Sequence, residues 1–406
     1  MKTKKILTTT LTLIIFQFSF SQDLTKEDFL KEELEGPDHT TAIAGYGEAK
    51  YEYNIREKTA RANLTRAVLF VGHKFNDKIS FFSELEVEDA KVIGGKPGGE
   101  IALEQAFLKF SLNKDINLAA GLLIPRIGII NENHLPTTFN GNDRPYLESL
   151  LIPTTWRELG LCIYGKSNKI TGLNYSLGLV NGLNSEGFEY GTGIREGRFE
   201  GRDASASNIA ITGALLYFIN NFRIQISGYY GGSAGLNKMQ SDTLHLSNGA
   251  FGTPVMLTEA NIQYGKKGFS FRAIGTMVQI NDAEKINHAY DNNIAKKMLG
   301  AYAEIGYNLL KLSKKETQQN LTLFGRYEYI DLNYEIAKNG INNDYLKNAF
   351  FIAGISYQPI IGVIIKADYV THTTGEPNPH IESLLPAGQT FYRSNNFFNL
   401  GIGYSF

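Results

Sequence analysis

The feature that most constrains the fold is a set of sixteen segments in which apolar and polar residues alternate at period two. Successive side chains of a β-strand point to opposite faces, so each segment can form a strand with one apolar and one polar face. In 78–89, Leu85 and Val87 share one face, whereas Glu84 and Glu86 share the other. The alternation predicts strands at 43–54, 62–75, 78–89, 101–112, 116–126, 155–165, 171–181, 207–218, 222–232, 254–265, 268–280, 298–310, 320–332, 347–358, 361–373 and 396–406.

The connections between these segments decide the fold class. Short links such as 76–77 and 220–221 alternate with long ones, of which 127–153 and 182–206 are the longest. Short turns at one rim and long loops at the other, with an even number of strands, are typical of an outer-membrane barrel. A soluble sandwich would explain the alternation but not these connections. We therefore predict an all-β fold, a 16-stranded antiparallel transmembrane β-barrel over 42–406.

The amino-terminal region indicates export. Residues 1–21 have the basic start, apolar stretch and small-residue end of a secretory signal peptide. No later apolar run approaches the roughly 20 residues of a membrane helix. Residues 22–41 are predicted to be a short periplasmic segment, either a simple helix or a subunit contact or partial plug.

Charge and cysteine content exclude other classes. Removing the three lysines of the signal peptide changes the formal charge from -1 to -4, which is too balanced for a nucleic-acid-binding protein. Cys162 is the only cysteine, so no disulfide framework is possible. The absence of a linker or composition shift favours one large β domain.

The membrane determines which face points outward. Every backbone group in lipid must be paired, so the sheet must close and its apolar face must contact lipid. A barrel of sixteen strands is too wide for side chains alone to fill, which predicts water inside. The charged strand residues are then interpreted as a solvated inner wall: Glu84, Glu86, Glu88, Lys109, Glu158, Arg223, Arg272, Glu304, Arg326, Glu328, Lys366 and Asp368.

The last segment strengthens the barrel prediction. Its apolar face consists of Phe398, Leu400, Ile402, Tyr404 and the terminal Phe406. An alternating strand that ends on an aromatic residue resembles the closing strand of bacterial outer-membrane barrels. The resemblance implies the outer membrane of a Gram-negative bacterium, where the assembly machinery reads the terminal Phe.

Two motifs resemble strands of the phosphate-selective porin O and P family. The first lies in 118–128 and has a glycine four residues before a proline. The second lies in 151–160 and contains Pro153, Arg157 and Gly160. The resemblance implies a sixteen-stranded porin, a homotrimer in outer-membrane lipid, in which the third extracellular loop folds inward between the two motifs.

The inward loop supplies the candidate pore constriction. We expect Arg126, Arg144 and Arg157 to contact anions, with Glu132 as a counter-charge. The mixture of signs predicts only weak ion preference, because opposite charges across a water-filled pore favour neither sign. Each residue could equally form a salt bridge that holds the loop against the wall.

We predict a porin that passes small hydrophilic solutes or ions by diffusion, with an anion or phosphate preference as the finer possibility. A ligand-binding or adhesin-like barrel is the alternative, and an outer-membrane hydrolase is less favoured. Ser233 lies in a Gly-x-Ser-x-Gly pattern, but a polar loop rather than a helix follows it. The histidines lack zinc-protease spacing. We therefore predict no enzyme, no catalytic residues, no cofactor and no metal.

Overall fold

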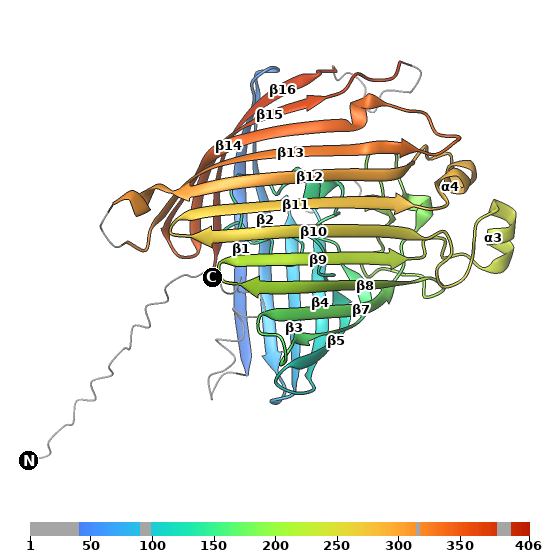
Figure 1. The fold of residues 1–406 in the computed structure, drawn as a ribbon, viewed down its shortest axis with the longest axis horizontal. Helices are drawn as coiled ribbons and strands as arrows, with labels where there is room; N and C mark the ends of the chain where they lie inside the picture. Colours follow the sequence, from blue (N-terminus) through green and yellow to red (C-terminus); the bar gives the residue numbers. More distant parts are fainter. Residues whose placement is uncertain (1–39, 90–98, 314–316, 380–390) are drawn as a thin grey trace, which may run out of the picture.

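The computed structural model describes residues 40–89, 99–313, 317–379 and 391–406. Sixteen antiparallel strands form one closed barrel, in which β1 pairs with both β2 and β16 (Figure 1). The strands are β1 (Thr41–Asn54), β2 (Thr59–Lys74), β3 (Ile79–Glu88), β4 (Ile101–Ser111), β5 (Ile116–Leu123), β6 (Glu158–Lys166), β7 (Leu173–Asn181), β8 (Ile209–Ile219), β9 (Phe222–Gly231), β10 (Val255–Lys266), β11 (Phe269–Ile280), β12 (Ala295–Asn308), β13 (Asn320–Ile336), β14 (Lys347–Ile360), β15 (Val363–Thr374) and β16 (Ser394–Ser405).

All sixteen predicted strands are confirmed. The largest difference in their bounds is in β13, which ends at Ile336 instead of 332. The predicted signal peptide, 1–21, and all but the last two residues of the predicted segment 22–41 lie outside the described residues.

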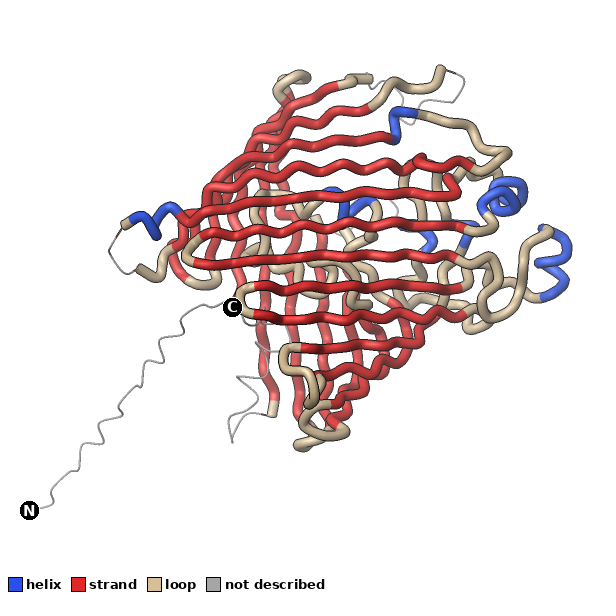
Figure 2. Tube along the Cα trace, in the orientation of Figure 1, coloured by secondary structure: helices blue, strands red, loops and turns tan. Residues whose placement is uncertain are grey.

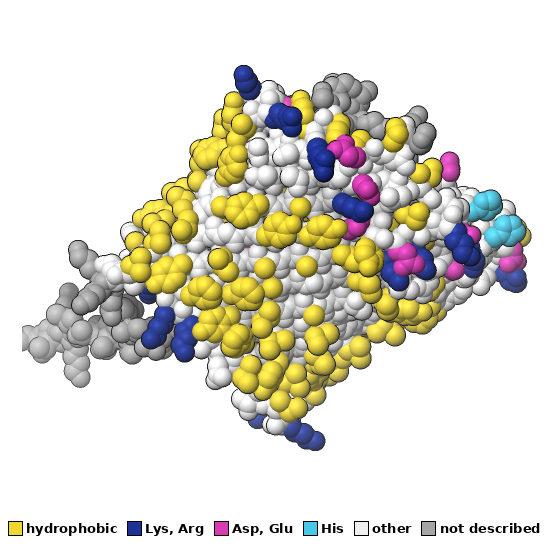
Figure 3. Space-filling view, turned by 45° about the horizontal axis from the view of Figure 1, so that its top comes forward, with side chains coloured by type: hydrophobic (Ala, Val, Ile, Leu, Met, Phe, Trp, Pro, Cys, Tyr) yellow, Lys and Arg dark blue, Asp and Glu magenta, His cyan; other side chains and the backbone are white. Residues whose placement is uncertain are grey.

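The two faces of the strands differ as the alternation predicts. In β16, Leu400 and Ile402 are 43% and 59% exposed, whereas Asn399 is 1% exposed. The same difference holds around the barrel, and hydrophobic side chains cover much of the outer surface (Figure 3). Such an apolar outer face is the face that contacts lipid in outer-membrane barrels.

The two rims also differ. Connections at one rim are short turns, such as 75–78, 220–221 and 361–362, except for 309–319, which contains η3 (Leu309–Leu312). Connections at the other rim are long and include α3 (Lys238–Leu244) and α4 (Ala283–Tyr290), although the first, 55–58, is a tight turn there. Among the described residues, no helix combines the length and apolar character needed to cross a bilayer.

Protein fills part of the barrel interior. The connection 124–157, which joins β5 to β6 and includes α2 (Tyr146–Leu150), packs between the walls (Figure 2). Its apolar side chains form one buried cluster with strand residues such as Val255, Leu257 and Ile274. Part of the inner wall is therefore apolar.

The interpretation of the charged strand residues as a solvated wall is wrong for most of them. For Glu304, Glu328 and Asp368, the connection 124–157 supplies hydrogen bonds that water would otherwise make. Only Glu88, Arg223 and Arg272 are partly exposed. The buried ones are Glu84, Glu86, Lys109, Glu158, Glu304, Arg326, Glu328, Lys366 and Asp368.

Candidate pore constriction and buried polar cluster

The two ends of the connection 124–157 are held together by Asn131. Its Nδ2 donates to the Pro125 carbonyl at 2.8 Å, and its Oδ1 accepts from the Trp156 amide at 2.8 Å. Trp156 is fully buried, packs against Tyr229 at 4.7 Å between ring centroids, and donates from its indole nitrogen to Glu158 at 2.7 Å. The connection therefore returns to the point on the wall where it began.

The helix α2 is fastened by its own glutamate. Glu148 accepts hydrogen bonds from the amides of Ile129 and Ile130 at 2.7 and 2.6 Å and from the Tyr302 hydroxyl at 2.7 Å. Burial raises the pKa of this carboxyl to about 7, against the lowering effect of the three donors. Glu148 thus ties two parts of the connection to β12.

A buried arginine on β13 connects the wall to the middle of the connection. Arg326 forms ion pairs with Glu304 at 3.2 Å and Glu328 at 2.8 Å, and it donates to the Asn140 carbonyl at 3.2 Å. Glu328 in turn accepts from the Leu147 amide at 2.8 Å. These wall charges pair with one another and with the connection.

A third contact lies on β15 and β16. Asp368 accepts from the Asn142 amide at 2.7 Å and from its Nδ2 at 2.6 Å. Gly401 on β16 lies against Asn142, and a Cβ at this position would collide with Asn142 Oδ1. The absence of a side chain on β16 therefore lets the connection approach the strand closely.

On the opposite side of the interior, a recess of about 80 Å³ remains between the connection and β4–β8. Arg126 and Glu132 lie at its edge and form a two-point ion pair, with N–O distances of 2.7 and 2.6 Å. Their side chains are 17% and 30% exposed. The remaining lining is mostly small or apolar: Gln105, Phe107, Ala119, Leu123, Ile124, Pro125, Cys162, Tyr164, Ser176, Gly178, Val180 and Thr212.

The structure brings together only two of the four predicted constriction residues. Arg126 and Glu132 meet at the recess, whereas Arg144 and Arg157 are not among its lining residues. Arg157 is buried and pairs with Glu200 at 2.8 Å, in the connection between β7 and β8. Burial lowers the pKa of Arg144, whose Nε and Nη2 are buried without a hydrogen-bond partner among the described residues.

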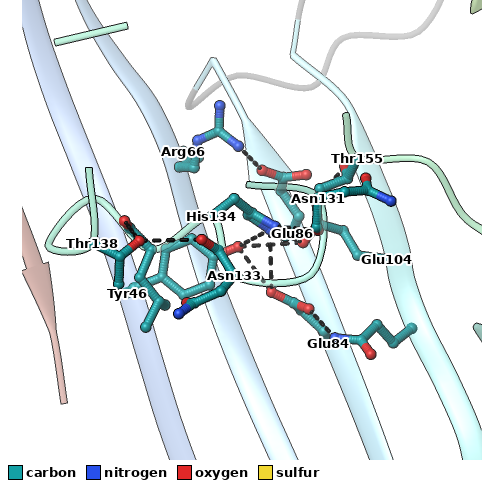
Figure 4. Close-up of polar contacts among 12 residues, drawn as sticks. Tyr46, Arg66, Glu84, Glu86, Glu104, Asn131, Asn133, His134, Thr138 and Thr155 are labelled. Atoms are coloured by element: carbon teal, nitrogen blue, oxygen red, sulfur yellow. Dashed lines mark hydrogen bonds and ion pairs between the residues drawn. The ribbon is translucent and has the colours of Figure 1, made fainter. Parts of the chain in front are cut away.

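A buried polar cluster lies where the connection meets β1, β3 and β4. His134 Nε2 is 3.0 Å from Glu104 Oε2 and 3.8 Å from Glu84 Oε1. The Tyr46 hydroxyl lies among them, 2.8 Å from Glu84 Oε1, 2.8 Å from His134 Nε2 and 3.3 Å from Glu104 Oε2 (Figure 4). One imidazole and two carboxylates at these distances are a possible set of metal ligands.

The alternation predicted an inward position for Glu84 but did not identify this cluster. Tyr46, Glu104, His134 and Asn131 were missed. Glu104 offered a signal, because the alternation of 101–112 breaks there and a break in period two indicates a β-bulge. His134 offered none, since its partners lie on strands far away in the sequence.

Comparison with known proteins gives one clear relative. A protein of Aquifex aeolicus (strain VF5), described as uncharacterized, is 32% identical over 342 residues, which cover 81% of this chain and 75% of the relative. The chain belongs to the same family as this Aquifex protein. No protein-family model matches the chain. The resemblance to the phosphate-selective porin O and P family therefore stays a prediction.

Solved structures show the fold. The chain is similar to an anion-selective porin from Comamonas acidovorans, with a TM-score of 0.53, 12% identity and coverage of 90% of this chain and 99% of the porin. The corresponding values for Salmonella typhi OmpF in complex with daunomycin are 0.54, 10%, 90% and 97%. Those for OmpT of Vibrio cholerae are 0.51, 11%, 90% and 97%. The fold is that of outer-membrane porins, which points to the outer membrane.

Proposed function

We propose that the protein is an outer-membrane porin that lets small hydrophilic solutes or ions diffuse through a water-filled channel. The observation that carries this proposal is the asymmetry of the interior. The connection 124–157 hydrogen bonds to side chains on β1, β9 and β11–β16, and to Glu104 on β4 and Glu158 on β6, but a recess remains along β4–β8. The proposed path follows that recess and passes the pair Arg126–Glu132.

The paired charges favour weak ion selectivity. Arg126 and Glu132 neutralise each other at the edge of the recess, so neither sign of ion is attracted strongly. Arg157 pairs with Glu200, away from the lining. We therefore propose a general porin rather than one with a strong phosphate preference.

We further propose a homotrimer. One of the structural neighbours is a trimer form of OmpT from Vibrio cholerae, with a TM-score of 0.50 and 11% identity. The mass of the detergent-solubilised protein, measured by light scattering with the detergent contribution subtracted, tests this directly. A monomeric mass at all protein concentrations would reject the trimer.

The channel is tested by its conductance in planar bilayers, with the single cysteine as a probe of the path. Cys162 lines the recess, so a charged methanethiosulfonate reagent should attach there and lower the conductance of each open channel. The matched control Cys162→Ser should conduct as the wild type does and ignore the reagent.

Two results would contradict the proposal in different ways. If a folded, heat-modifiable barrel gave no conductance, the open channel would be rejected and a ligand-binding or adhesin-like barrel favoured. If the channels conducted but modification of Cys162 left the current unchanged, the path along β4–β8 would be wrong.

A further inference from the structure

The cluster around His134 has the geometry of a metal site. The donor atoms of Glu84, Glu104 and His134 lie within 4.8 Å of one another, and none of these residues is more than 1% exposed. When a tetrahedrally coordinated ion lies about 2.1 Å from each of its ligand atoms, those ligand atoms lie about 3.4 Å from one another. The distances from His134 Nε2 to the two carboxylates, 3.0 and 3.8 Å, lie on either side of that value.

The imidazole is oriented for ligation. His134 Nδ1 lies 3.1 Å from the Asn131 carbonyl oxygen, which can only accept a hydrogen bond. Nδ1 therefore carries a proton, and Nε2, the nitrogen that can serve as the ligand, faces the two carboxylates. A backbone carbonyl behind a metal-binding histidine is the usual means of holding the ring and selecting its tautomer.

A β-bulge delivers the second carboxylate. Glu84 pairs with Gln105 and Leu85 with Leu103, so Glu104 has no partner on β3. Both Glu104 and Gln105 consequently turn away from the outer face, while Leu103 stays 48% exposed. Bulges of this kind redirect side chains at functional sites. Without the bulge, the pleat would place Glu104 and Gln105 on opposite faces.

In each of the two glutamates, the carboxylate oxygen that faces away from His134 is also held by a hydrogen bond. Thr155 donates to Glu104 Oε1 at 2.7 Å, and Gln105 donates to Glu84 Oε2 at 2.7 Å. Each glutamate thereby directs its other oxygen toward His134. Gln105 also lines the recess, so its side chain separates the cluster from the proposed water path.

We propose that Glu84, Glu104 and His134 bind a divalent transition-metal ion, for which Zn²⁺ best suits one nitrogen and several oxygens in a four-coordinate site. The two carboxylate charges balance the charge of the ion, and the Tyr46 hydroxyl stands where a fourth ligand belongs. His134 comes from the connection and the glutamates come from β3 and β4. The ion therefore fastens the connection to the wall beside the recess, a role that does not depend on what the channel conducts.

The test uses the full-length barrel in detergent with Zn²⁺ as the probe. After chelation, incubation with Zn²⁺ and desalting, elemental analysis should find one zinc per chain. X-ray absorption should show one imidazole and two or three oxygens as nearest neighbours. Glu104→Gln and His134→Gln should weaken Zn²⁺ binding at least ~100-fold, since loss of a ligand should exceed the effect of outer-shell changes.

The histidine in α4 provides the matched control. His288 is exposed on α4, so His288→Ala should bind Zn²⁺ as tightly as the wild type does. Wild-type protein that retains no zinc would overturn the proposal even if every variant failed to fold. Equal binding by wild type and by folded Glu104→Gln protein would also overturn it, because the zinc would then lie elsewhere.

Discussion

The two sides of the barrel interior differ in chemistry. On β12, β13 and β15, inward-facing residues such as Arg326 and Asp368 are charged, buried and bonded to the connection 124–157. On β5–β8, the residues that line the recess are small or apolar, such as Ala119 and Ser176. The charges of this inner wall lie mainly where it contacts protein, not where the recess remains.

The difference has a physical cause. An irregular connection inside a barrel has backbone amides and carbonyls that cannot pair with a neighbouring strand, and burying them unpaired is costly. Charged side chains on β13 pair with such groups: Glu328 accepts from the Leu147 amide, and Arg326 donates to the Asn140 carbonyl. Along the recess, the lining side chains are mostly small or apolar and leave room.

The largest effect is expected at Arg326. Arg326→Met leaves Glu304 and Glu328 as buried charges without this partner, which should lower the free energy of unfolding by about 3–5 kcal/mol. On the opposite side, Ser176→Ala should change it by less than about 0.5 kcal/mol. Urea unfolding in lipid vesicles, followed by the fluorescence of Trp156, measures both. If the two substitutions lowered the free energy of unfolding equally, the proposed difference between the two sides of the interior would be wrong.

The second-largest effect is expected in the pH dependence of stability, through Glu148. Burial raises the pKa of this carboxyl to about 7 in the folded protein, against about 4.5 in the unfolded chain. The folded state therefore binds this proton more tightly, so the contribution of Glu148 to stability is complete below about pH 4.5 and is lost as the pH rises to about 7. At about 1.4 kcal/mol per pKa unit, the loss should be on the order of 3 kcal/mol.

Glu148→Gln is the matched variant for this prediction. Its amide oxygen can still accept from Ile129 and Ile130, and its NH₂ group can donate to the Tyr302 oxygen. Between pH 5 and pH 8, the stability of the variant should therefore fall less than that of the wild type, by the contribution of Glu148. If the stability of the wild type and that of the variant fell equally over this range, the proposed titration of Glu148 would be wrong.

A smaller effect is expected from glycines. Gly401→Ala places a methyl group against Asn142, which must move and weaken its bonds to Asp368, at a cost of about 1–3 kcal/mol. Gly325→Ala, where nothing lies within 4 Å of the new atom, should be neutral or slightly stabilising. If both variants unfold at the same urea concentration, the connection does not press on β16 as the structure indicates.

The sequence predicts the barrel well because strand structure depends on local pattern. The alternation of Leu400 and Ile402 with Asn399 is visible in a few residues, and each strand pairs with its neighbours in the chain. The interior could not be predicted in this way. Asn142 meets Asp368 more than 200 residues later, and no local pattern indicates that contact.

The constriction shows the same limit at the level of single residues. Arg126 and Glu132 are six positions apart, so their pairing was a reasonable expectation from the sequence. Arg157 pairs with Glu200 of another long connection, and Arg144 lies close enough to Arg66 on β2 and Glu104 on β4 to interact with their charges. Which loop arginines reach the lumen depends on how the loops pack, and composition does not contain that information.

Substitutions of Arg126 and Glu132 should change stability least of all, but they should change the ion selectivity of the channel. Because both side chains are partly exposed, removing either charge should cost at most about 1 kcal/mol. Arg126→Gln leaves Glu132 alone at the recess and should shift the reversal potential in a salt gradient toward cation preference. Glu132→Gln should shift it toward anions, and the double variant should return it to the wild-type value. Shifts of the same sign in both single variants would show that the pair does not face the conducting path.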